Sequence, residues 1–345
     1  MTITPLDPWI KAKIGQHEGK KLSAEKLYRY QTDRLREVID YVRRKSPFYR
    51  KHLAGVPEDF LSCPKDITRL PFTTEADLRG QCLDMLCVSQ SDISRIVTLF
   101  SSGSTAAPKR LFFTDEDLEL TVDFFHHGMT TLTDPKSRVM IFMPGKKPGS
   151  IGDLLKKGLM RMNSVGFAYG PVTDSDDAMD ALLKFKPHCL VGLPVQMLGL
   201  ARHPGKTGIP EGLIKSILLS ADYVPASIVA ELESSLNVTV YEHYGMTEMG
   251  LGGGVQCRHR EGYHLREADL FFEVIDPQTG QPQIDGRTGE VVFTTLTRRG
   301  MPLVRYRTGD LAKFLQGSCP CGTSLRRMGK VKGRISGAAK RVWTV

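Results

Sequence analysis

One stretch decides the fold of this chain: Ser101-Ser102-Gly103-Ser104-Thr105-Ala106-Ala107-Pro108-Lys109. It follows the apolar run 96–100 and is rich in small hydroxyl side chains, so we expect a loop that leaves a buried strand. The glycine lets the backbone approach a ligand closely, and the lysine adds a mobile positive charge. Convergent hydroxyls, backbone N–H groups and a cation suit a polyphosphate. The plainer alternative is a serine-rich surface turn.

The composition is that of a globular protein of two or three subdomains, with 345 residues, 41% hydrophobic and 25% charged. No segment reaches the ~18 consecutive apolar residues of a membrane span, and the N-terminus lacks the apolar core of a signal peptide. We therefore expect no membrane association and a cytoplasmic location. The net charge of +9 suits phosphate-rich ligands. Because the basic residues are spread without interleaved aromatics, we expect no nucleic acid partner.

The middle of the chain alternates helices with short apolar strands, which indicates an α/β layered core with a largely parallel sheet. Ligands of such sheets collect at the carboxyl ends of the strands, where we expect the loop after residue 100 to lie. The predicted helices are 23–45, 115–127, 178–185 and 228–236, and the predicted strands are 110–113, 139–143, 189–192, 217–220 and 238–242. The hydroxyls of Thr73 and Thr74, followed by the acidic residues of the segment from Glu75 to Arg79, also indicate the N-cap of a helix.

After about residue 250 the pattern becomes β-like, with strands predicted over 271–275, 289–295 and 303–306, between turns rich in glycine and Asp-Pro. We therefore expect a small β subdomain in this part of the chain. The predicted organisation is an N-terminal helical region of the large domain (1–90), an α/β nucleotide-binding core (91–250), the β subdomain (251–332) and a residual hinge (333–345).

Three further motifs accompany the Ser-rich stretch. Tyr244-Gly245-Met246-Thr247-Glu248 follows the last predicted strand of the core. Tyr306-Arg307-Thr308-Gly309-Asp310 is predicted to end a β segment with its aspartate on a tight turn, which would present a carboxylate to two vicinal hydroxyls. Gly333-Arg334 follows a basic, strand-like stretch. Each motif alone is weak evidence.

Together, in this order and spacing, the four motifs resemble the adenylate-forming superfamily of acyl-CoA synthetases, in its phenylacetate–coenzyme A ligase branch, which includes coenzyme F390 synthetases. The resemblance covers nearly the whole chain, since Ser46 to Arg50, Leu70 to Thr74 and Met301 to Thr308 also look like that branch. It implies a layered α/β/α large domain with a small β-barrel-like subdomain. A Walker-type NTPase is excluded because Gly103 is not followed by Gly-Lys-Ser/Thr.

The resemblance implies ATP-dependent activation of a small carboxylic acid, aryl and phenylacetate-like, to an acyl-adenylate, followed by thioester formation with coenzyme A. Glu248 would bind Mg²⁺ and Thr247 would contact the α-phosphate. Asp310 would hold the ribose hydroxyls, with Arg334 nearby. The β- and γ-phosphates would be held by Ser101, Ser102, Gly103, Ser104 and Thr105 with Lys109.

The resemblance also implies which residues line the adenine and acyl pockets. The segment Ser220-Ala221-Asp222 stands where the family usually has a Gly-Ala/Gly-Glu turn beside adenine, and Tyr244, followed by Gly245, would stack on the base. The loop from Pro144 to Gly152, with Phe142 and Met143 before it, is the expected wall of the acyl pocket.

The seven cysteines are an odd number in a chain without an export signal, which argues against a disulfide framework. Cys257 and His264, with the pair Cys319 and Cys321, offer three sulfurs and an imidazole that could converge tetrahedrally on Zn²⁺. This set is similar to a structural metal site of the phenylacetate ligase branch. His259 is the rival to His264.

The sequence departs from the family in three places. Ala106 stands where a glycine is usual, and Ile335-Ser336-Gly337 replaces the acidic residues that usually follow Gly-Arg. A full-length member would continue into a mobile domain that carries a catalytic lysine, whereas this chain ends at Val345. We therefore keep open several alternatives: a sequence truncated relative to a full ligase, an impaired enzyme, and an enzyme that borrows a separate small domain. A non-catalytic adenylate-binding or scaffold protein, and acyl transfer to the thiol of an acceptor protein, also stay open. A homodimer is also left open.

Overall fold

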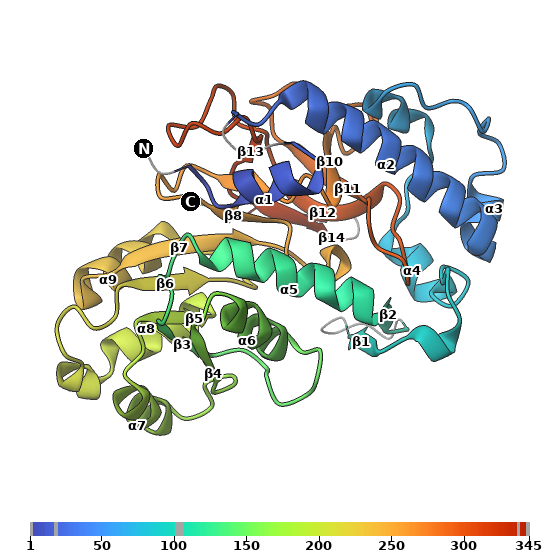
Figure 1. Cartoon of the computed structure of the whole chain (residues 1–345). Coiled ribbons are helices and arrows are strands. Elements are labelled where there is room, and N and C mark those ends of the chain that lie inside the picture. Colours follow the sequence, from blue (N-terminus) through green and yellow to red (C-terminus); the bar gives the residue numbers. More distant parts are fainter. Residues whose placement is uncertain (1–2, 17–19, 101–106, 337–338, 343–345) are drawn as a thin grey trace.

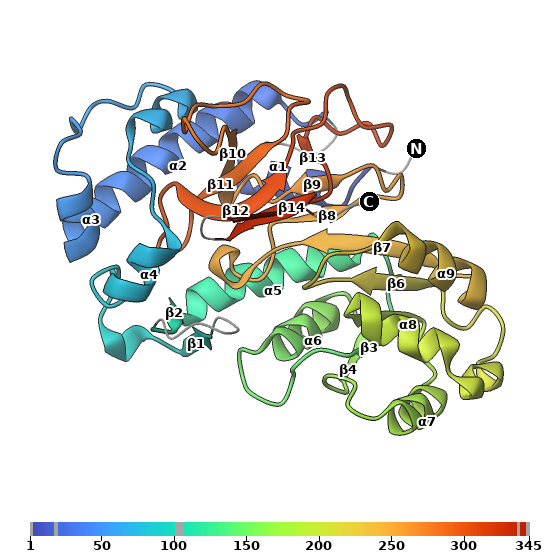
Figure 2. The same cartoon turned by 180° about the vertical axis from the view of Figure 1, so that it is seen from behind.

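The architecture is described by a computed structural model of the chain, in which residues 3–16, 20–100, 107–336 and 339–342 are described. An eight-stranded sheet with helices on both faces forms one half of the molecule, and a five-stranded sheet with the N-terminal helices forms the other (Figure 1). The long helix α5 (Asp115–Met129) lies between the two sheets, as the view from behind also shows (Figure 2). Within the described residues, no helix is long and apolar enough to cross a bilayer.

The larger sheet has the strand order β13-β9-β8-β7-β6-β5-β3-β4. The five strands from β4 to β7 are mutually parallel, and β8, β9 and β13 extend the sheet, each antiparallel to the strands beside it. Their bounds are β3 (Arg138–Ile141), β4 (Val165–Ala168), β5 (Cys189–Gly192), β6 (Ser216–Leu219), β7 (Thr239–Tyr244), β8 (Gly254–Gln256), β9 (Tyr263–Leu265) and β13 (Arg327–Met328).

Successive side chains of the parallel strands enter two different cores, because side chains alternate across a sheet. Val139 and Ile141 of β3 pack with α5 and α6, whereas Met140 between them packs with α7, α8 and α9. This confirms the layered α/β/α class. The covering helices are α6 (Ile151–Arg161), α7 (Ser175–Phe185), α8 (Pro194–Arg202) and α9 (Ala226–Leu236).

The smaller sheet is antiparallel, in the order β10-β11-β12-β14-β15. The N-terminal helix α2 (Ala24–Lys45) covers it, since Leu35, Val38 and Val42 share one hydrophobic core with Val291 and Phe293 of β11. The strands are β10 (Leu270–Ile275), β11 (Gly289–Thr295), β12 (Tyr306–Ala312), β14 (Gly333–Ser336) and β15 (Ala339–Val342). The remaining helices are α1 (Leu6–Lys13), α3 (Pro47–His52) and α4 (Glu75–Gln81), with 3₁₀ turns η1 (Pro64–Arg69), η2 (Gln90–Asp92), η3 (Pro204–Gly208) and η4 (Thr247–Met249).

The strand before the Ser-rich stretch differs from the prediction. Among the residues that the structure describes, β1 (Arg95–Leu99) pairs only with β2 (Lys109–Phe113), in a two-stranded antiparallel hairpin outside the parallel sheet. Its side chains alternate between half-buried and exposed, so it is not the buried strand that we expected. Ser101, Ser102, Gly103, Ser104 and Thr105 therefore connect two strands of a hairpin and do not follow a strand of the parallel sheet; they lie outside the described residues.

A second correction concerns Asp310, which lies within β12 and not on a turn after a strand. The strand predicted over 303–306 starts only at Tyr306 and continues to Ala312. Between the pairs Glu290–Leu311 and Val292–Arg307, three residues of β12 stand opposite Val291 alone. Gly309, with a φ of +79°, makes this bulge possible. The bulge re-aims the aspartate while the strand continues.

Candidate active site

A buried ion pair joins β2 to the turn η4. The ammonium of Lys109, the first residue of β2, contacts Oε1 of Glu248 in η4, and the two residues are only 7% and 1% exposed. The hydroxyl of Tyr306 donates to the same carboxylate oxygen at 3.4 Å. Oε1 of Glu75, at the start of α4, lies 4.0 Å from the ammonium. The lysine is thus held by carboxylates from two other segments.

The helix α4 also contacts Ala107, near the end of the Ser-rich stretch. Arg79 donates from Nη1 to the carbonyl oxygen of Ala107 and from Nη2 to Glu75, both at 2.5 Å. Thr74 starts this helix through a capping box with Asp77, the pattern that its sequence predicts. The end of the hairpin connection is therefore anchored to a capped helix.

A polar cleft lies where the two halves of the molecule meet. Its centre is Asp310, whose Oδ2 accepts a hydrogen bond from the hydroxyl of Tyr244 at 3.0 Å and whose Oδ1 lies 3.7 Å from Nε of Arg334. Burial raises the pKa of the Asp310 carboxyl, against the opposing effect of the Arg334 guanidinium. The residues that line the cleft are Ala221, Asp222, Tyr223, Val224, Glu242, His243, Tyr244, Gly245, Tyr263, Asp310, Lys330, Val331 and Arg334.

Part of this cleft was not predicted from the sequence. Glu242, the residue before His243 on β7, pairs with the ammonium of Lys330 and accepts a hydrogen bond from the hydroxyl of Tyr263 at 3.2 Å. Lys330 stands four residues before Arg334, so the basic stretch itself was the only signal for it. The predicted cluster Tyr244, Gly245, Asp310 and Arg334 is brought together here.

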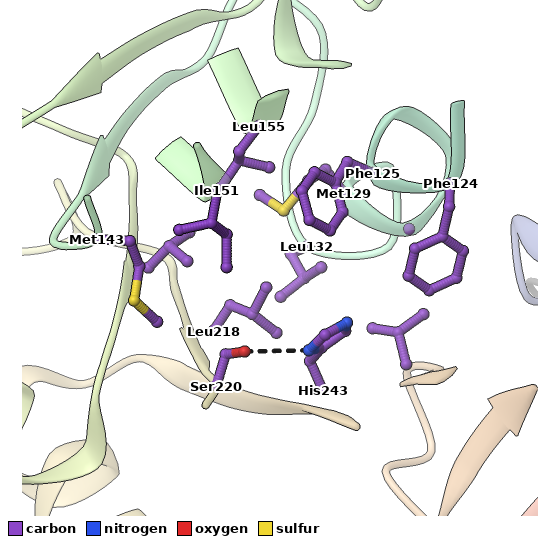
Figure 3. A pocket seen from close by; sticks show the side chains of 13 residues that line it. Phe124, Phe125, Met129, Leu132, Met143, Ile151, Leu155, Leu218, Ser220 and His243 are labelled. Atoms are coloured by element: carbon purple, nitrogen blue, oxygen red, sulfur yellow. Dashed lines mark hydrogen bonds between the residues drawn. The ribbon is translucent and has the colours of Figure 1, made fainter. Parts of the chain in front are cut away.

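An apolar pocket adjoins the polar cleft, because His243 lines both (Figure 3). The space open to the centre of a water molecule is about 30 Å³ in this pocket and about 170 Å³ in the polar cleft. The walls of the apolar pocket come from α5, α6 and the ends of β3, β5, β6, β7 and β8. They are formed by Phe124, Phe125, Gly128, Met129, Leu132, Met143, Ile151, Leu155, Val191, Leu218, Ser220, His243 and Val255.

The apolar pocket contains one polar pair, the hydroxyl of Ser220 and Nδ1 of His243, at 3.0 Å. Burial lowers the pKa of His243 to about 4, so the imidazole is neutral near pH 7. Ser220 thus lies in the apolar pocket, whereas Ala221 and Asp222, predicted beside it, line the polar cleft. Of the segment expected to form the acyl wall, Met143 and Ile151 line the pocket.

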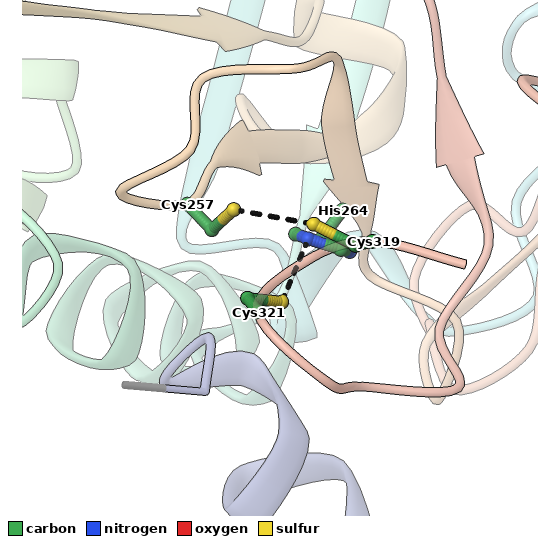
Figure 4. Close-up of side chains that lie close together, drawn as sticks. All are labelled: Cys257, His264, Cys319 and Cys321. Carbon is green, nitrogen blue, oxygen red and sulfur yellow. Dashed lines mark hydrogen bonds between the residues drawn. The ribbon is translucent and has the colours of Figure 1, made fainter. Parts of the chain in front are cut away.

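Four side chains that could hold a metal ion lie together where the β8–β9 hairpin meets the connection between β12 and β13 (Figure 4). Cys257 follows β8, His264 lies in β9, and Cys319 and Cys321 lie between β12 and β13. Their ligand atoms are all within 4.8 Å of one another, and the four residues are at most 4% exposed. His259, the rival ligand, is not part of this cluster.

The distances between the ligand atoms of this cluster fit tetrahedral coordination of a metal ion better than a disulfide bond. The sulfurs of Cys257 and Cys319 are 3.6 Å apart, and the sulfur of Cys321 is 3.5 Å from Nε2 of His264. Two sulfurs bound to zinc at about 2.3 Å in a tetrahedron lie roughly 3.7 Å apart, whereas a disulfide brings them to about 2.05 Å. All seven cysteines are free.

Comparison with known proteins identifies the family of the chain. The model of the family described as "AMP-binding enzyme" matches residues 69–296 of this chain. The phenylacetate–coenzyme A ligase of Thermus thermophilus is 31% identical over 331 residues, which are 92% of this chain and 73% of that protein. The ligase of the same name from Pseudomonas putida is 29% identical over 330 residues, 90% of this chain and 71% of that protein.

Among solved structures, an open conformation of 2-hydroxyisobutyryl-CoA ligase, in complex with 2-HIB-AMP and CoA, has a TM-score of 0.81 at 22% identity. The match covers 91% of this chain and 71% of that one, and at this identity it shows the fold. The chain belongs to the AMP-binding enzyme family. Within that family it is an AMP-forming acid–thiol ligase of the phenylacetate–coenzyme A ligase type. Enzymes of this class take ATP, a carboxylic acid and coenzyme A.

Proposed function

We propose that this enzyme activates a small carboxylic acid with an apolar, aryl side chain to an acyl-adenylate, and then transfers the acyl group to coenzyme A. The observation that carries the proposal is the juxtaposition of the two pockets. Ser220 and Ala221 are adjacent in the chain, yet one lines the apolar pocket and the other the polar cleft, while His243 lines both. A molecule with a hydrocarbon end and a nucleotide end would span this junction.

The polar cleft is the proposed nucleotide site. Asp310 would accept the ribose hydroxyls, with Arg334 beside it, and Tyr244, Gly245, Ala221 and Asp222 would surround adenine; the lining of the cleft supports these roles. A buried carboxylate that has one tyrosine donor retains acceptor capacity for a diol.

The buried pair Lys109–Glu248 is the proposed phosphate and metal site. Lys109, with Ser101 to Thr105, would contact the β- and γ-phosphates, Thr247 the α-phosphate, and Glu248 would bind Mg²⁺, which would offset phosphate charge during attack at the α-phosphorus. In-line displacement at phosphorus depends on positioning and charge neutralisation more than on a strong base. A buried carboxylate next to a buried ammonium fits the two opposite charges of magnesium and phosphate.

The apolar pocket is the proposed acyl site. Its side chains are aliphatic, aromatic or thioether, with one polar pair, so it favours a hydrocarbon acyl group. Its small volume favours a compact group, and the two methionines Met129 and Met143 can adapt to a ring.

The test is ATP–pyrophosphate exchange over a panel of aryl and short aliphatic acids. We expect exchange with at least one acid, and a loss of roughly 10²–10³-fold in Glu248→Gln, the size typical of one lost electrostatic contact. Glu211→Gln, at an exposed site, should leave the rate unchanged. Absence of exchange for every acid, with ATP still bound, contradicts the proposal.

A second candidate is a non-catalytic adenylate-binding protein, favoured by the replacement of the usual acidic residues by Ile335-Ser336-Gly337. Robust acyl-CoA synthesis by the purified chain rules it out. Activity that appears only when a separate small domain is added indicates a partner-dependent enzyme. An acyl adduct detected by intact-protein mass spectrometry indicates transfer to a protein thiol. A cytoplasmic location and a homodimer remain predictions.

We propose a structural zinc ion for the cluster of Cys257, His264, Cys319 and Cys321. With four protein ligands and complete burial, the ion would join the β8–β9 hairpin to the β12–β13 connection and take no part in the reaction. Metal analysis of the purified protein should give about one zinc per chain, and a value near zero contradicts this. Cys319→Ser should lower the melting temperature, whereas Cys63→Ser, outside the cluster, should not.

A further inference from the structure

The pair Ser220–His243 has no counterpart elsewhere in the apolar pocket. Ser220 directly follows β6, and His243 lies on the neighbouring parallel strand β7, whose residue Glu242 pairs in register with Leu219. The hydroxyl of Ser220 therefore points across the sheet to Nδ1 of His243 at 3.0 Å (Figure 3). The serine is 6% exposed. The two groups satisfy each other, but Nε2 of His243 is buried without a hydrogen-bond partner among the described residues, and burying such a polar atom costs free energy.

The place of the pair indicates its role. Ala221 and Asp222, the next two residues, line the polar cleft, as do Tyr244 and Gly245 after the histidine. The pair thus stands where the acyl pocket meets the nucleotide cleft. In an acyl-adenylate bound across both, which rests on the proposed function, the carbonyl group is the part that lies at this junction.

The direction of the hydrogen bond follows from the surroundings of the other ring nitrogen. Nε2 of His243 is buried and has no hydrogen-bond partner among the described residues. It lies near Gly252 and Phe124: a Cβ built on Gly252 would be 3.3 Å from Nε2 and 2.3 Å from the Phe124 ring. A buried N–H without an acceptor is costly, whereas a lone pair can face the positive edge of an aromatic ring. The proton is therefore assigned to Nδ1, which donates to the serine oxygen.

With its oxygen accepting from His243, the Ser220 hydroxyl has its own proton free to donate. Burial lowers the pKa of the imidazole to about 4, so this arrangement persists over the working range of pH. The backbone N–H of Ser220 is already used, since it donates to the carbonyl of Gly192 at 3.2 Å. The side-chain hydroxyl is the donor that remains at the junction from this residue.

We propose that Ser220 donates a hydrogen bond to a carboxylate oxygen of the acid, and afterwards to the carbonyl oxygen of the acyl-adenylate, with His243 as the positioning residue that orients the hydroxyl. The oxygen is an anion in the acid and a carbonyl in the adenylate, and one O–H donor serves both.

Kinetics test the contact through the separation of two Michaelis constants. In ATP–pyrophosphate exchange, Ser220→Ala should raise KM for the acid about tenfold to a hundredfold, the size of one hydrogen bond to a charged group, with KM for ATP within twofold. Ser220→Thr, which keeps the hydroxyl, should lose less. His243→Asn, whose amide N–H lies close to the place of Nδ1, should retain most of the activity that His243→Phe loses. An unchanged acid KM in Ser220→Ala overturns the proposal.

A binding comparison tests the same contact without turnover. Two probes are compared. The first is the sulfamoyl-adenosine analogue of the best acid in the panel, or of phenylacetic acid if no acid supports exchange, and it keeps the acyl carbonyl. The second is the alkyl ester of AMP, which lacks that carbonyl. Ser220→Ala should weaken the carbonyl analogue about tenfold relative to the wild type, while the ester and AMP bind as before and show that the variant is folded. Equal effects on both analogues overturn the proposal.

The outcomes separate this inference from the proposed function. If no acid supports exchange, the proposed function fails, and the two analogues still decide whether Ser220 reads a carbonyl. If Ser220→Ala impairs exchange only with acids that carry a hydroxyl or amino substituent, the pair binds that substituent, and the proposal for the carboxylate is wrong.

Discussion

The polar cleft and the apolar pocket share a wall at His243 but are built on opposite principles. The cleft is formed by charged side chains from distant segments, which already pair with one another: Asp310 with Arg334 and Tyr244, and Glu242 with Lys330. Apart from Ser220 and His243, the pocket is formed by apolar side chains, most of which belong to one hydrophobic core. A ligand must replace charge pairs in the first site, whereas it only needs to fit in the second.

This difference implies that substitutions in the two sites fail in different ways. Loss of one charge in or beside the cleft leaves another buried charge without its partner, which costs both stability and binding. A change of shape in the pocket should alter which acid is accepted and leave the nucleotide unaffected.

The largest expected effect belongs to the buried pair Lys109–Glu248. Lys109→Met leaves the Glu248 carboxylate buried without its cation, so we expect a loss of about 3–5 kcal/mol in the free energy of unfolding, together with the loss of exchange activity. The double variant with Glu248→Gln should regain most of the stability and none of the activity. Urea unfolding and pyrophosphate exchange measure the two.

The matched control for this prediction is an exposed pair. Asp285→Asn breaks the ion pair with Arg326, in which both side chains are more than 40% exposed, and should cost less than about 1 kcal/mol. If Lys109→Met costs as little as this control, burial does not distinguish the two pairs and the contrast between the sites weakens.

The next effect is a pH dependence of stability that arises in the apolar pocket. Burial lowers the pKa of His243 from 6.5 to about 4, so between these values the unfolded chain binds a proton that the folded chain does not. Stability is therefore fully present above pH 6.5 and is lost as the pH falls toward 4, by about 2–3 kcal/mol from this residue at pH 4.5. His243→Phe should lose correspondingly less stability between pH 7 and pH 4.5. Exposed His259→Gln serves as the control, and parallel curves for wild type and His243→Phe contradict the prediction.

A third prediction isolates the ribose contact in the cleft. Asp310→Ala should raise KM for ATP about tenfold to a hundredfold, because a hydrogen-bonding carboxylate is lost, and leave KM for the acid unchanged. For 2′,3′-dideoxy-ATP, which lacks both hydroxyls, the same substitution should have little effect. An equal loss for ATP and the dideoxy analogue would mean that the aspartate acts through Tyr244 or Arg334 and not through the ribose.

The smallest effect comes from one methyl group in the pocket. Gly128 lies on α5 with a helical backbone, and a Cβ there would meet Val255 at an ordinary 3.7 Å. Gly128→Ala should therefore stabilise the fold by up to about 1 kcal/mol and shift the preference to smaller acids by a few fold, with KM for ATP unchanged. Gly199→Ala on α8, with open space around its Cβ, should stabilise similarly without any change in acid preference.

The sequence predicted the elements best where the strands are buried and regular. The strands 189–192 and 289–295 were predicted at their observed bounds, and the capped start of α4 was predicted from its hydroxyl and acidic residues. The hairpin β1–β2 was missed because an apolar run of five residues does not reveal whether its partner is parallel or antiparallel. The bulge at Gly309 was missed because the sequence does not give a φ angle.

The polar cleft and the apolar pocket also differ in how well the sequence predicted their residues. Tyr244, Gly245, Asp310 and Arg334 were predicted because motifs of unusual residues mark them, and the four-residue cysteine and histidine cluster was predicted for the same reason. Most of the apolar pocket was not, since Phe124, Phe125 and Met129 have the helical spacing of ordinary core residues. The pairing of Ser220 with His243 depends on strand register, which the sequence does not reveal.

The ion pair between Lys109 and Glu248 also has a consequence for competition inside a cell. Because the ammonium of Lys109 is paired with the Glu248 carboxylate, a simple anion such as inorganic phosphate or sulfate would have to displace a buried carboxylate to reach it. If this pair is the phosphate and metal site proposed above, a nucleotide that arrives with its own divalent ion would offer a new partner to each side chain at once. The site would then discriminate against small anions and favour a ligand that brings both charges together.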